Sequence, residues 1–223
     1  MAINIVIPVK NPSAAKQRLS DVLSADRRRD LAIAVFDHVL SVVLPVGAGA
    51  RHVLVVTDSS EIEDRVRRRA GTEFQRTVTV LRETAARGET AAVEDAARWS
   101  IEMGFDRQIV IPADLPCVRP EDIEKLMDEP LTPPAALLCP ATGDDGTNAI
   151  LTTPPDALKF RFGKRSFPDY LNQARARGVT CRVIRLPRMA LDLDTPEDLL
   201  TFIEEPKEGE PYRLVTGWNL QLT

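Results

Sequence analysis

Three cations follow the first apolar run of the chain within nine residues: Lys10, Lys16 and Arg18. Lysine and arginine side chains neutralise phosphate oxygens, and they stabilise the charge that builds up on a pyrophosphate leaving group. The spacing therefore suits a grip on a nucleoside triphosphate. A basic, solvated loop is the alternative interpretation, because no glycine-rich phosphate cradle accompanies these residues.

Carboxylates follow two other apolar segments. Asp114 stands in Pro112-Ala-Asp114-Leu-Pro116, directly after an apolar run, and Asp192 and Asp194 alternate with leucines near the C-terminus. In an extended segment the last two side chains share one face. Magnesium is commonly held by one or two carboxylates together with substrate phosphates. These three residues are therefore candidate Mg²⁺ ligands if the fold brings them together, whereas a lone Asp114 would merely cap the segment that follows it.

The residues just after this acidic pair have a structural signature. Thr195 and Asp198 have the spacing of a helix capping box, and Pro196 suits the first turn of a helix. We therefore expect a helix to begin here, and we assign these residues a structural role. Asp192 and Asp194 remain the ligand candidates of this segment.

A further segment suits an anion. It comprises residues 144–149, Asp-Asp-Gly-Thr-Asn-Ala, and then residues 160–167, in which Gly163, Lys164 and Arg165 precede Ser166. Ser166 is a candidate N-cap of an amphipathic helix, and a helix N-terminus offers free N–H groups and a positive dipole end. A phosphate group of an acceptor substrate fits such a site. The alternative is that Ser166 only caps its helix and the basic pair is solvated.

These segments need a scaffold that places them at one edge, and the apolar pattern predicts one. Strands are expected at residues 3–9, 52–57, 78–81, 108–111, 136–139 and 181–186. Continuous apolar runs are typical of strands buried on both faces, and helical periodicities lie between them. The alternation predicts an α/β domain with a mostly parallel sheet flanked by helices. In such sheets ligands bind beyond the carboxyl ends of the strands, where the segments above begin.

Composition limits the remaining possibilities. The chain has 223 residues with 43% hydrophobic content and a net charge of −4, which suits one domain and argues against nucleic-acid binding. No stretch approaches the roughly 18 apolar residues of a membrane span. The three cysteines lack metal or disulfide spacing, so we expect reduced core residues and a cytoplasmic location. Residues 1–203 are expected to form the domain, and residues 204–223 a polar linker with a short strand or docking arm.

Five motifs in order resemble one known family. They are Ile7-Pro-Val-Lys10 with Ala15-Lys16-x-Arg18-Leu, Pro112-Ala-Asp114-Leu-Pro116, Gly146-Thr147-Asn148-Ala, Phe162-Gly163-x-x-Ser166-Phe and Leu191-Asp-x-Asp194-Thr-Pro-Glu-Asp-Leu. The chain resembles the 2-phospho-L-lactate or phosphoenolpyruvate guanylyltransferases over residues 3 to about 203. The resemblance implies a nucleotide-diphospho-sugar-transferase-like, GT-A-like fold and a role in making the deazaflavin coenzyme F420.

The resemblance also assigns residues. It implies that Thr147, Gly163 and Ser166 hold the acceptor's phosphate and that the three aspartates bind the metal. The chain departs from the family at residues 88–92, Gly-Glu-Thr-Ala-Ala in place of Gly-Leu-Asn-Ala-Ala, a region expected near the nucleotide. A basic pair, residues 164–165, replaces a Pro-Gly-like pair and extends the candidate acceptors to the more anionic 3-phosphoglycerate.

We therefore expect a Mg²⁺-dependent guanylyltransferase that moves GMP from GTP to a small phosphorylated carboxylic acid and releases pyrophosphate. No membrane partner is expected, and the sequence is compatible with a homo-oligomer. One alternative is a related nucleotidyltransferase that acts on a sugar phosphate or on molybdopterin. The other is a non-catalytic nucleotide-binding module, because a shared fold does not fix function.

Overall fold

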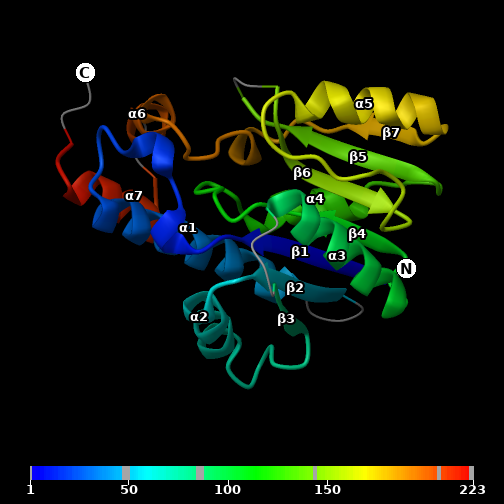
Figure 1. The fold of residues 1–223 in the computed structure, drawn as a ribbon, viewed down its shortest axis with the longest axis horizontal. Helices are drawn as coiled ribbons and strands as arrows, with labels where there is room; N and C mark the ends of the chain where they lie inside the picture. The colour runs from blue at the N-terminus through cyan, green and yellow to red at the C-terminus, as the bar shows by residue number, and fades with distance from the viewer. Residues whose placement is uncertain (1, 47–50, 84–87, 143–144, 205–206, 221–223) are drawn as a thin grey trace.

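The structure is a computed structural model that describes residues 2–46, 51–83, 88–142, 145–204 and 207–220. Its strands are β1 (Ile3–Val9), β2 (Arg51–Thr57), β3 (Val78–Arg82), β4 (Arg107–Val110), β5 (Ala135–Pro140), β6 (Thr147–Thr153) and β7 (Thr180–Val183). They form a seven-stranded sheet in the order β3-β2-β1-β4-β6-β5-β7 (Figure 1).

The sheet is mostly parallel, as the sequence predicts. Only β6 runs against its neighbours, since it pairs antiparallel with both β4 and β5. Its residues, Thr147–Thr153, were missing from the strands that the apolar pattern predicts. The expectation that the strands are buried on both faces holds for β1 but is wrong for β7, an edge strand that is largely exposed and that ends at Val183 rather than at residue 186.

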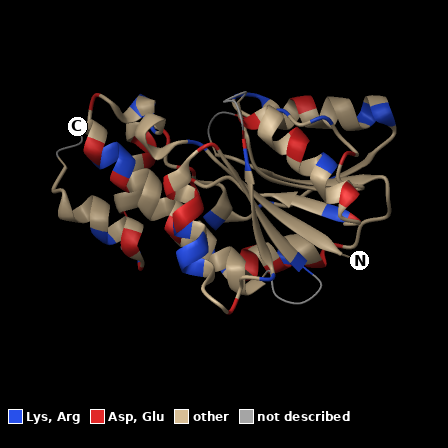
Figure 2. Ribbon diagram, turned by 60° about the horizontal axis from the view of Figure 1, so that its bottom comes forward, with Lys and Arg blue, Asp and Glu red and all other residues tan. Residues whose placement is uncertain are grey.

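Helices cover both faces of the sheet. On one face lie α1 (Ala25–Val46), α2 (Ser60–Ala70), α4 (Pro120–Asp128), α6 (Pro196–Glu204) and α7 (Glu210–Gly217). On the other face lie α3 (Glu89–Glu102) and α5 (Ser166–Arg177). Strand β1 alternates between the two layers, because Ile5 and Ile7 contribute to the first core and Val6 to the second. Charged residues accordingly gather on the helices and leave the centre of the sheet almost uncharged (Figure 2).

The strand order fixes where a ligand can bind. Strands β1 and β4 are parallel neighbours, while β2 and β3 continue the sheet on the other side of β1. The connections therefore diverge at the carboxyl ends of β1 and β4, and such a switch point opens a crevice between the loops. The loops that leave these two strands carry Lys10 and Asp114.

The C-terminal extension forms a helix rather than the expected short strand. Gly209 is the N-cap of α7, and Pro211, which needs no N–H partner, occupies its first turn. The helix packs on α1 and α6, and its Pro211 and Val215 are buried. The segment packs on the domain as a helix, because a proline at its start and a buried face every few residues favour one. The division of the chain at residue 203 stays a prediction.

Two further expectations concern membrane-spanning helices and the burial of the cysteines. None of the helices in the described ranges is long and apolar enough to cross a bilayer. All three cysteines are free, but only Cys139 is fully buried, whereas Cys117 and Cys181 are partly exposed. The expectation of three core cysteines is therefore right for one of them.

Val215 tests whether α7 belongs to the folded core. Its side chain is 1% exposed against α1, so Val215→Ala should lower the free energy of unfolding by about 2 kcal/mol through lost apolar burial. Thr216→Ala, at the exposed next position, should change it by less than about 0.5 kcal/mol. Urea denaturation measures both, and equal small effects would show that α7 adds nothing to stability.

Candidate active site

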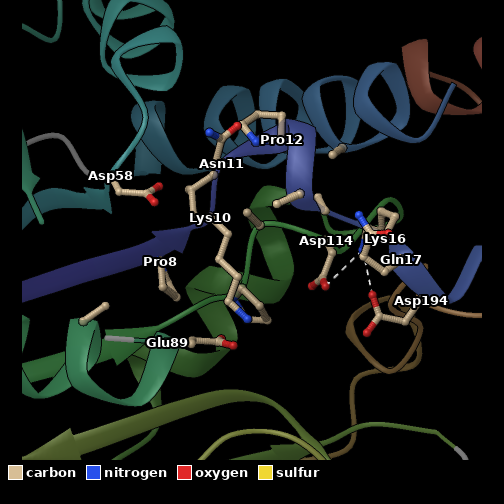
Figure 3. A pocket seen from close by; sticks show the side chains of 18 of the residues that line it. Pro8, Lys10, Asn11, Pro12, Lys16, Gln17, Asp58, Glu89, Asp114 and Asp194 are labelled. Atoms are coloured by element: carbon tan, nitrogen blue, oxygen red, sulfur yellow. Dashed lines mark hydrogen bonds and ion pairs between the residues drawn. The ribbon is translucent and has the colours of Figure 1, made fainter. Parts of the chain in front are cut away.

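A cleft of about 530 Å³ opens beyond the carboxyl ends of β1, β2 and β4. Its charged lining consists of three cations and five acids, namely Lys10, Lys16, Arg18, Asp58, Glu83, Glu89, Asp114 and Asp194. Figure 3 shows that Lys10 points into the middle of the cleft, with Asp58 on one side of it and Asp114 and Asp194 on the other. The three predicted cations therefore share one cavity with two of the predicted metal ligands.

Lys16 is the centre of this charged cluster. Its side chain is only 6% exposed, and its Nζ lies 3.2 Å from Asp114 Oδ2 and 3.0 Å from Asp194 Oδ1. Burial alone lowers the pKa of Lys16, but the charges and hydrogen bonds of the two carboxylates outweigh it and raise the pKa above its usual value. The ammonium group is therefore charged at neutral pH, and it joins the loop after β1 to two distant acidic segments.

Lys16 adopts a backbone conformation that few non-glycine residues adopt. Its φ is 56°, in the left-handed region, immediately before the short 3-10 helix η2 (Gln17–Leu19). Such a conformation costs energy and persists where surrounding contacts hold it. The two ion pairs of Lys16 and the buried Leu19 supply those contacts. Two 3-10 turns thus accompany these cations, η1 (Pro12–Ala14) before Lys16 and η2 directly after it.

The two neighbouring aspartates differ in their protonation. Burial raises the pKa of Asp194, but Lys16 and Arg18 outweigh it and lower the pKa below its ordinary value. Arg18 lies 3.7 Å from Asp194 and its side chain is 55% exposed. Burial and the charge of Asp114 raise the pKa of Asp192 to about 7. Once Asp114, Asp192 and Asp194 are all ionised, their three negative charges therefore exceed the two positive charges of Lys16 and Arg18.

The structure brings all three predicted metal ligands together. One oxygen from each of Asp114, Asp192 and Asp194 lies within 4.8 Å of the other two. Carboxylate oxygens are the donors that Mg²⁺ prefers, and the ammonium of Lys16 already contacts two of these residues. The donor set and its attraction for a cation therefore fit a divalent metal.

Local structure fixes the acidic segment. Thr195 and Asp198 form the predicted capping box, with the Thr195 amide 2.7 Å from Asp198 Oδ2 and the Asp198 amide 3.3 Å from Thr195 Oγ1. The amide of Asp194 donates to the same Asp198 carboxylate at 3.0 Å. Upstream, Arg188 donates twice to the buried Asp122 of α4, at 2.8 Å each. The ligand segment is thus anchored on both sides.

The predicted acceptor residues form a second cluster. Ser166 Oγ donates to Thr147 Oγ1 at 3.2 Å, and both side chains are buried. Asn148, next to Thr147, donates to Asp192 at 3.1 Å. The acceptor cluster therefore adjoins the carboxylates, although it does not line the 530 Å³ cleft.

The prediction that Ser166 caps its helix is wrong. Ser166 is the first residue of α5, and the N-cap is Arg165, in a left-handed conformation with φ 63°. Gly163, with φ 94°, turns the chain so that the hydroxyl of Ser166 faces Thr147 instead of the helix amides. Lys164 and Arg165 are exposed, as a solvated pair would be, and Asp144 lies outside the described residues.

Comparison with known proteins identifies the family. A family model described as guanylyl transferase, CofC-like, matches residues 3–212. The chain belongs to this family. A 3-phospho-D-glycerate guanylyltransferase of Colwellia psychrerythraea is 40% identical over 96% of this chain and 98% of that protein. A phosphoenolpyruvate guanylyltransferase of Rubrobacter xylanophilus is 38% identical over 96% and 98%. A 2-phospho-L-lactate guanylyltransferase of Methanothermobacter thermautotrophicus is 33% identical over 87% and 81%.

Solved structures agree on the fold. A Desulfovibrio desulfuricans protein described as a nucleotide-diphospho-sugar transferase superposes with a TM-score of 0.76 at 17% identity, over 98% of this chain and 96% of that one. A cytidylyltransferase of Leptospira borgpetersenii gives a TM-score of 0.57 at 15% identity over 98% and 94%. The nucleotide-diphospho-sugar-transferase-like fold that the sequence predicts is confirmed.

In this member of the CofC-like guanylyltransferase family, sequence reasoning missed Asp58 and Glu83, which line the cleft, and it placed Glu89 only within a region expected near the nucleotide. Glu89 opens α3 directly after Gly88, which has φ 87°. Burial, and then the charge of Asp114, raise the pKa of Glu89 from its ordinary 4.5 to about 7. The departure from the family pattern at residues 88–92 was the signal that pointed to this position. Asp58 and Glu83 carried no such signal, because each is a single acidic residue just after a strand.

Glu89 gives a prediction about stability and pH. Its pKa is higher in the folded chain than in the unfolded chain, so the unfolded state loses its proton first as pH rises. The contribution of Glu89 to stability therefore falls between about pH 4.5 and pH 7. Glu89→Gln removes this loss. The free energy of unfolding of the variant, measured relative to that of the wild type, should therefore be higher at pH 8 than at pH 5. The difference should be on the order of 1 kcal/mol after allowance for solvent screening.

Urea denaturation at the two pH values measures this difference. Glu102→Gln, at the exposed end of the same helix, is the matched control and should show the same relative stability at both pH values. A pH-independent effect of Glu89→Gln would contradict the assigned burial of this carboxyl group.

Proposed function

We propose that this chain is a guanylyltransferase that moves GMP from GTP to a small phosphorylated carboxylic acid with release of pyrophosphate. The observation that supports this proposal most strongly is that Lys16 contacts both Asp114 and Asp194 at the cleft beyond the carboxyl ends of β1 and β4, beside the Thr147–Ser166 pair. The names of its relatives support the same reaction with 3-phospho-D-glycerate, phosphoenolpyruvate or 2-phospho-L-lactate. We assign it to coenzyme F420 biosynthesis.

The cleft fits the nucleotide donor. Lys10, Lys16 and Arg18 all line it, and a cavity of about 530 Å³ lies in the range of pockets that hold small ligands. Arg18, which is more than half exposed, is free to swing onto an entering phosphate. We therefore assign these three cations to the triphosphate.

We propose Mg²⁺ on Asp114, Asp192 and Asp194. When bound, it would neutralise phosphate charge and act as a Lewis acid on the reacting phosphoryl group. Asn148 orients Asp192 through its 3.1 Å hydrogen bond, and Asp198 orients the backbone of Asp194. These contacts place the carboxylates before any cation arrives.

The acceptor is assigned to Thr147, Gly163 and Ser166. The two hydroxyls are buried and face each other, and the turn at Gly163 exposes the backbone before α5. The first two amides of this helix already donate to Gly163 O and Asp145 O, so the positive end of the helix dipole and the two hydroxyls are what would attract an anion. Lys164 and Arg165 add positive charge at the entrance, which favours a doubly anionic phospho-acid.

The reaction needs positioning and charge stabilisation rather than a base. An acceptor phosphate oxygen, already ionised, attacks the α-phosphorus of GTP. A new P–O bond forms as the bond from the α-phosphorus to the oxygen bridging to the β-phosphorus breaks, and pyrophosphate leaves with that electron pair. Lys16 and Arg18 stabilise the charge that develops on the leaving group. No covalent enzyme intermediate is required.

We propose a cytoplasmic location, supported by the free cysteines and by the use of GTP. The two alternative functions predict different results in one assay. A sugar phosphate or molybdopterin as the only productive acceptor would favour a related nucleotidyltransferase. Nucleotide binding without turnover would favour a non-catalytic module.

Pyrophosphate release by the purified chain tests the proposal. GTP with one of 2-phospholactate, phosphoenolpyruvate or 3-phosphoglycerate should give turnover, and ATP or CTP should not. Asp114→Asn should reduce kcat/KM by about 100-fold or more, because it removes a charged metal ligand worth several kcal/mol. Asp156→Asn, at an exposed position after β6, should leave it unchanged. Turnover that survives Asp114→Asn would rule out the assigned site.

Lys16 gives a prediction about metal affinity. Its ammonium group contacts two of the three proposed ligands, so it competes with a free cation when no nucleotide is present. Lys16→Met should therefore bind Mn²⁺ about 10-fold more tightly without nucleotide, while it loses transfer activity. The electron paramagnetic resonance signal of free Mn²⁺ reports the affinity. Lys125→Met, at an exposed position of α4, is the control. Unchanged or weaker Mn²⁺ binding by Lys16→Met would refute the competition between Lys16 and the metal.

A further inference from the structure

Asp58 stands at the end of the cleft away from the metal ligands. It follows β2 directly, at the carboxyl end of the strand beside β1, and it lines the same cavity as Lys10 and Lys16. In Figure 3 its carboxylate points toward Lys10 and Asn11, across the cleft from Asp114 and Asp194. It therefore faces the part of the cavity that lies away from Lys16, Asp114 and Asp194.

The side chain of Asp58 is incompletely hydrogen-bonded. Its Oδ1 is buried, and it has no hydrogen-bond partner within the described part of the chain. A buried polar atom without a partner is costly, so native structures pair such atoms with protein, water or ligand. The terminal torsion of aspartate is broad, so a small rotation presents both oxygens to a molecule in the cleft. Asp58 therefore has an acceptor oxygen to offer to a hydrogen-bond donor of a ligand.

The position of the phosphates determines which part of a nucleotide meets Asp58. Lys16 and Arg18 hold the triphosphate near Asp194, at one end of the cavity. A nucleotide extended from there through the cleft places its base toward the ends of β1 and β2, where Pro8, Val9 and Asp58 form the lining. The group that reaches Asp58 is accordingly the base.

Guanine has the hydrogen-bonding edge that a carboxylate matches. It carries N1–H and the 2-amino group side by side, so both donors reach the two oxygens of one carboxylate in parallel. Adenine and cytosine present an acceptor at the corresponding ring nitrogen, which a carboxylate repels. We propose that Asp58 is the residue that selects guanine, a step that rests on the proposed guanylyl transfer. Glu83 lines the same cleft and is the competing carboxylate.

Asp58→Asn with xanthosine triphosphate tests this assignment. The amide of asparagine supplies one acceptor for N1–H and one donor for the 2-oxo group of xanthine. Pyrophosphate release with a saturating acceptor should show kcat/KM for GTP reduced by about 100-fold or more and kcat/KM for xanthosine triphosphate increased, because a polar site discriminates strongly against a mismatched edge. Glu83→Gln is the matched variant and should keep the preference for GTP.

The outcomes separate the two proposals. Wild-type chain that releases no pyrophosphate from any nucleotide would refute the proposed function itself. Wild type active with GTP, together with Asp58→Asn that keeps its GTP preference, would overturn the role of Asp58. A gain of xanthosine triphosphate use by Glu83→Gln instead would also overturn it.

A measurement on the wild type keeps the proposal testable if Asp58→Asn does not fold. Inosine triphosphate has N1–H but lacks the 2-amino group, so it forms one of the two bonds to a carboxylate. The wild type should use it with a kcat/KM about 10-fold below that for GTP. Equal use of the two nucleotides would overturn carboxylate recognition of guanine.

Discussion

The site depends on one buried ammonium group. Lys16 lies 3.2 Å from Asp114 and 3.0 Å from Asp194, and these three residues come from the loop after β1, the loop after β4 and the segment before α6. A charge that is taken out of water is tolerated only when it is paired, so each segment needs the other two. These three side chains lie together on one side of the cleft (Figure 3). Site geometry and local stability are therefore coupled through a single side chain.

The electrostatic balance of this cluster suits ligands of both signs. Lys16 and Arg18 keep Asp194 ionised by lowering its pKa, whereas Asp192, farther from these cations and hydrogen-bonded to Asn148, has a pKa raised to about 7. Ionisation of Asp192 adds negative charge that a divalent cation neutralises. A metal that takes over the carboxylates would in turn free Lys16 for phosphate. Under the proposed function, cation and anion binding would therefore support each other.

Sequence reasoning predicted the parts of the site that depend on strand ends. Continuous apolar runs identify the parallel strands, and a parallel sheet brings the residues after them to one edge, which places Asp114 beside the cations. It did not predict the helix of residues 210–217, because Tyr212 to Val215 has the β-branched and aromatic character of a strand, whereas the proline in the first turn and the packing on α1 favour a helix. Nor does sequence show that Glu89 and Asp58 face the cleft, since side-chain direction depends on how a loop closes.

The least predictable element, β6, accounts for the position of the acceptor cluster. A parallel strand would deliver its carboxyl end to the ligand edge, but β6 runs antiparallel to β4, with Val110 paired to Ile150. Its amino end therefore lies at that edge, where the first two residues of the strand, Thr147 and Asn148, contact Ser166 and Asp192 respectively. The reversal also gives β5 and β6 a direct antiparallel pairing, which needs no crossover helix between the two strands. One reversed strand thus sets the acceptor residues against the donor cleft, and a fully parallel sheet would direct them to its opposite edge.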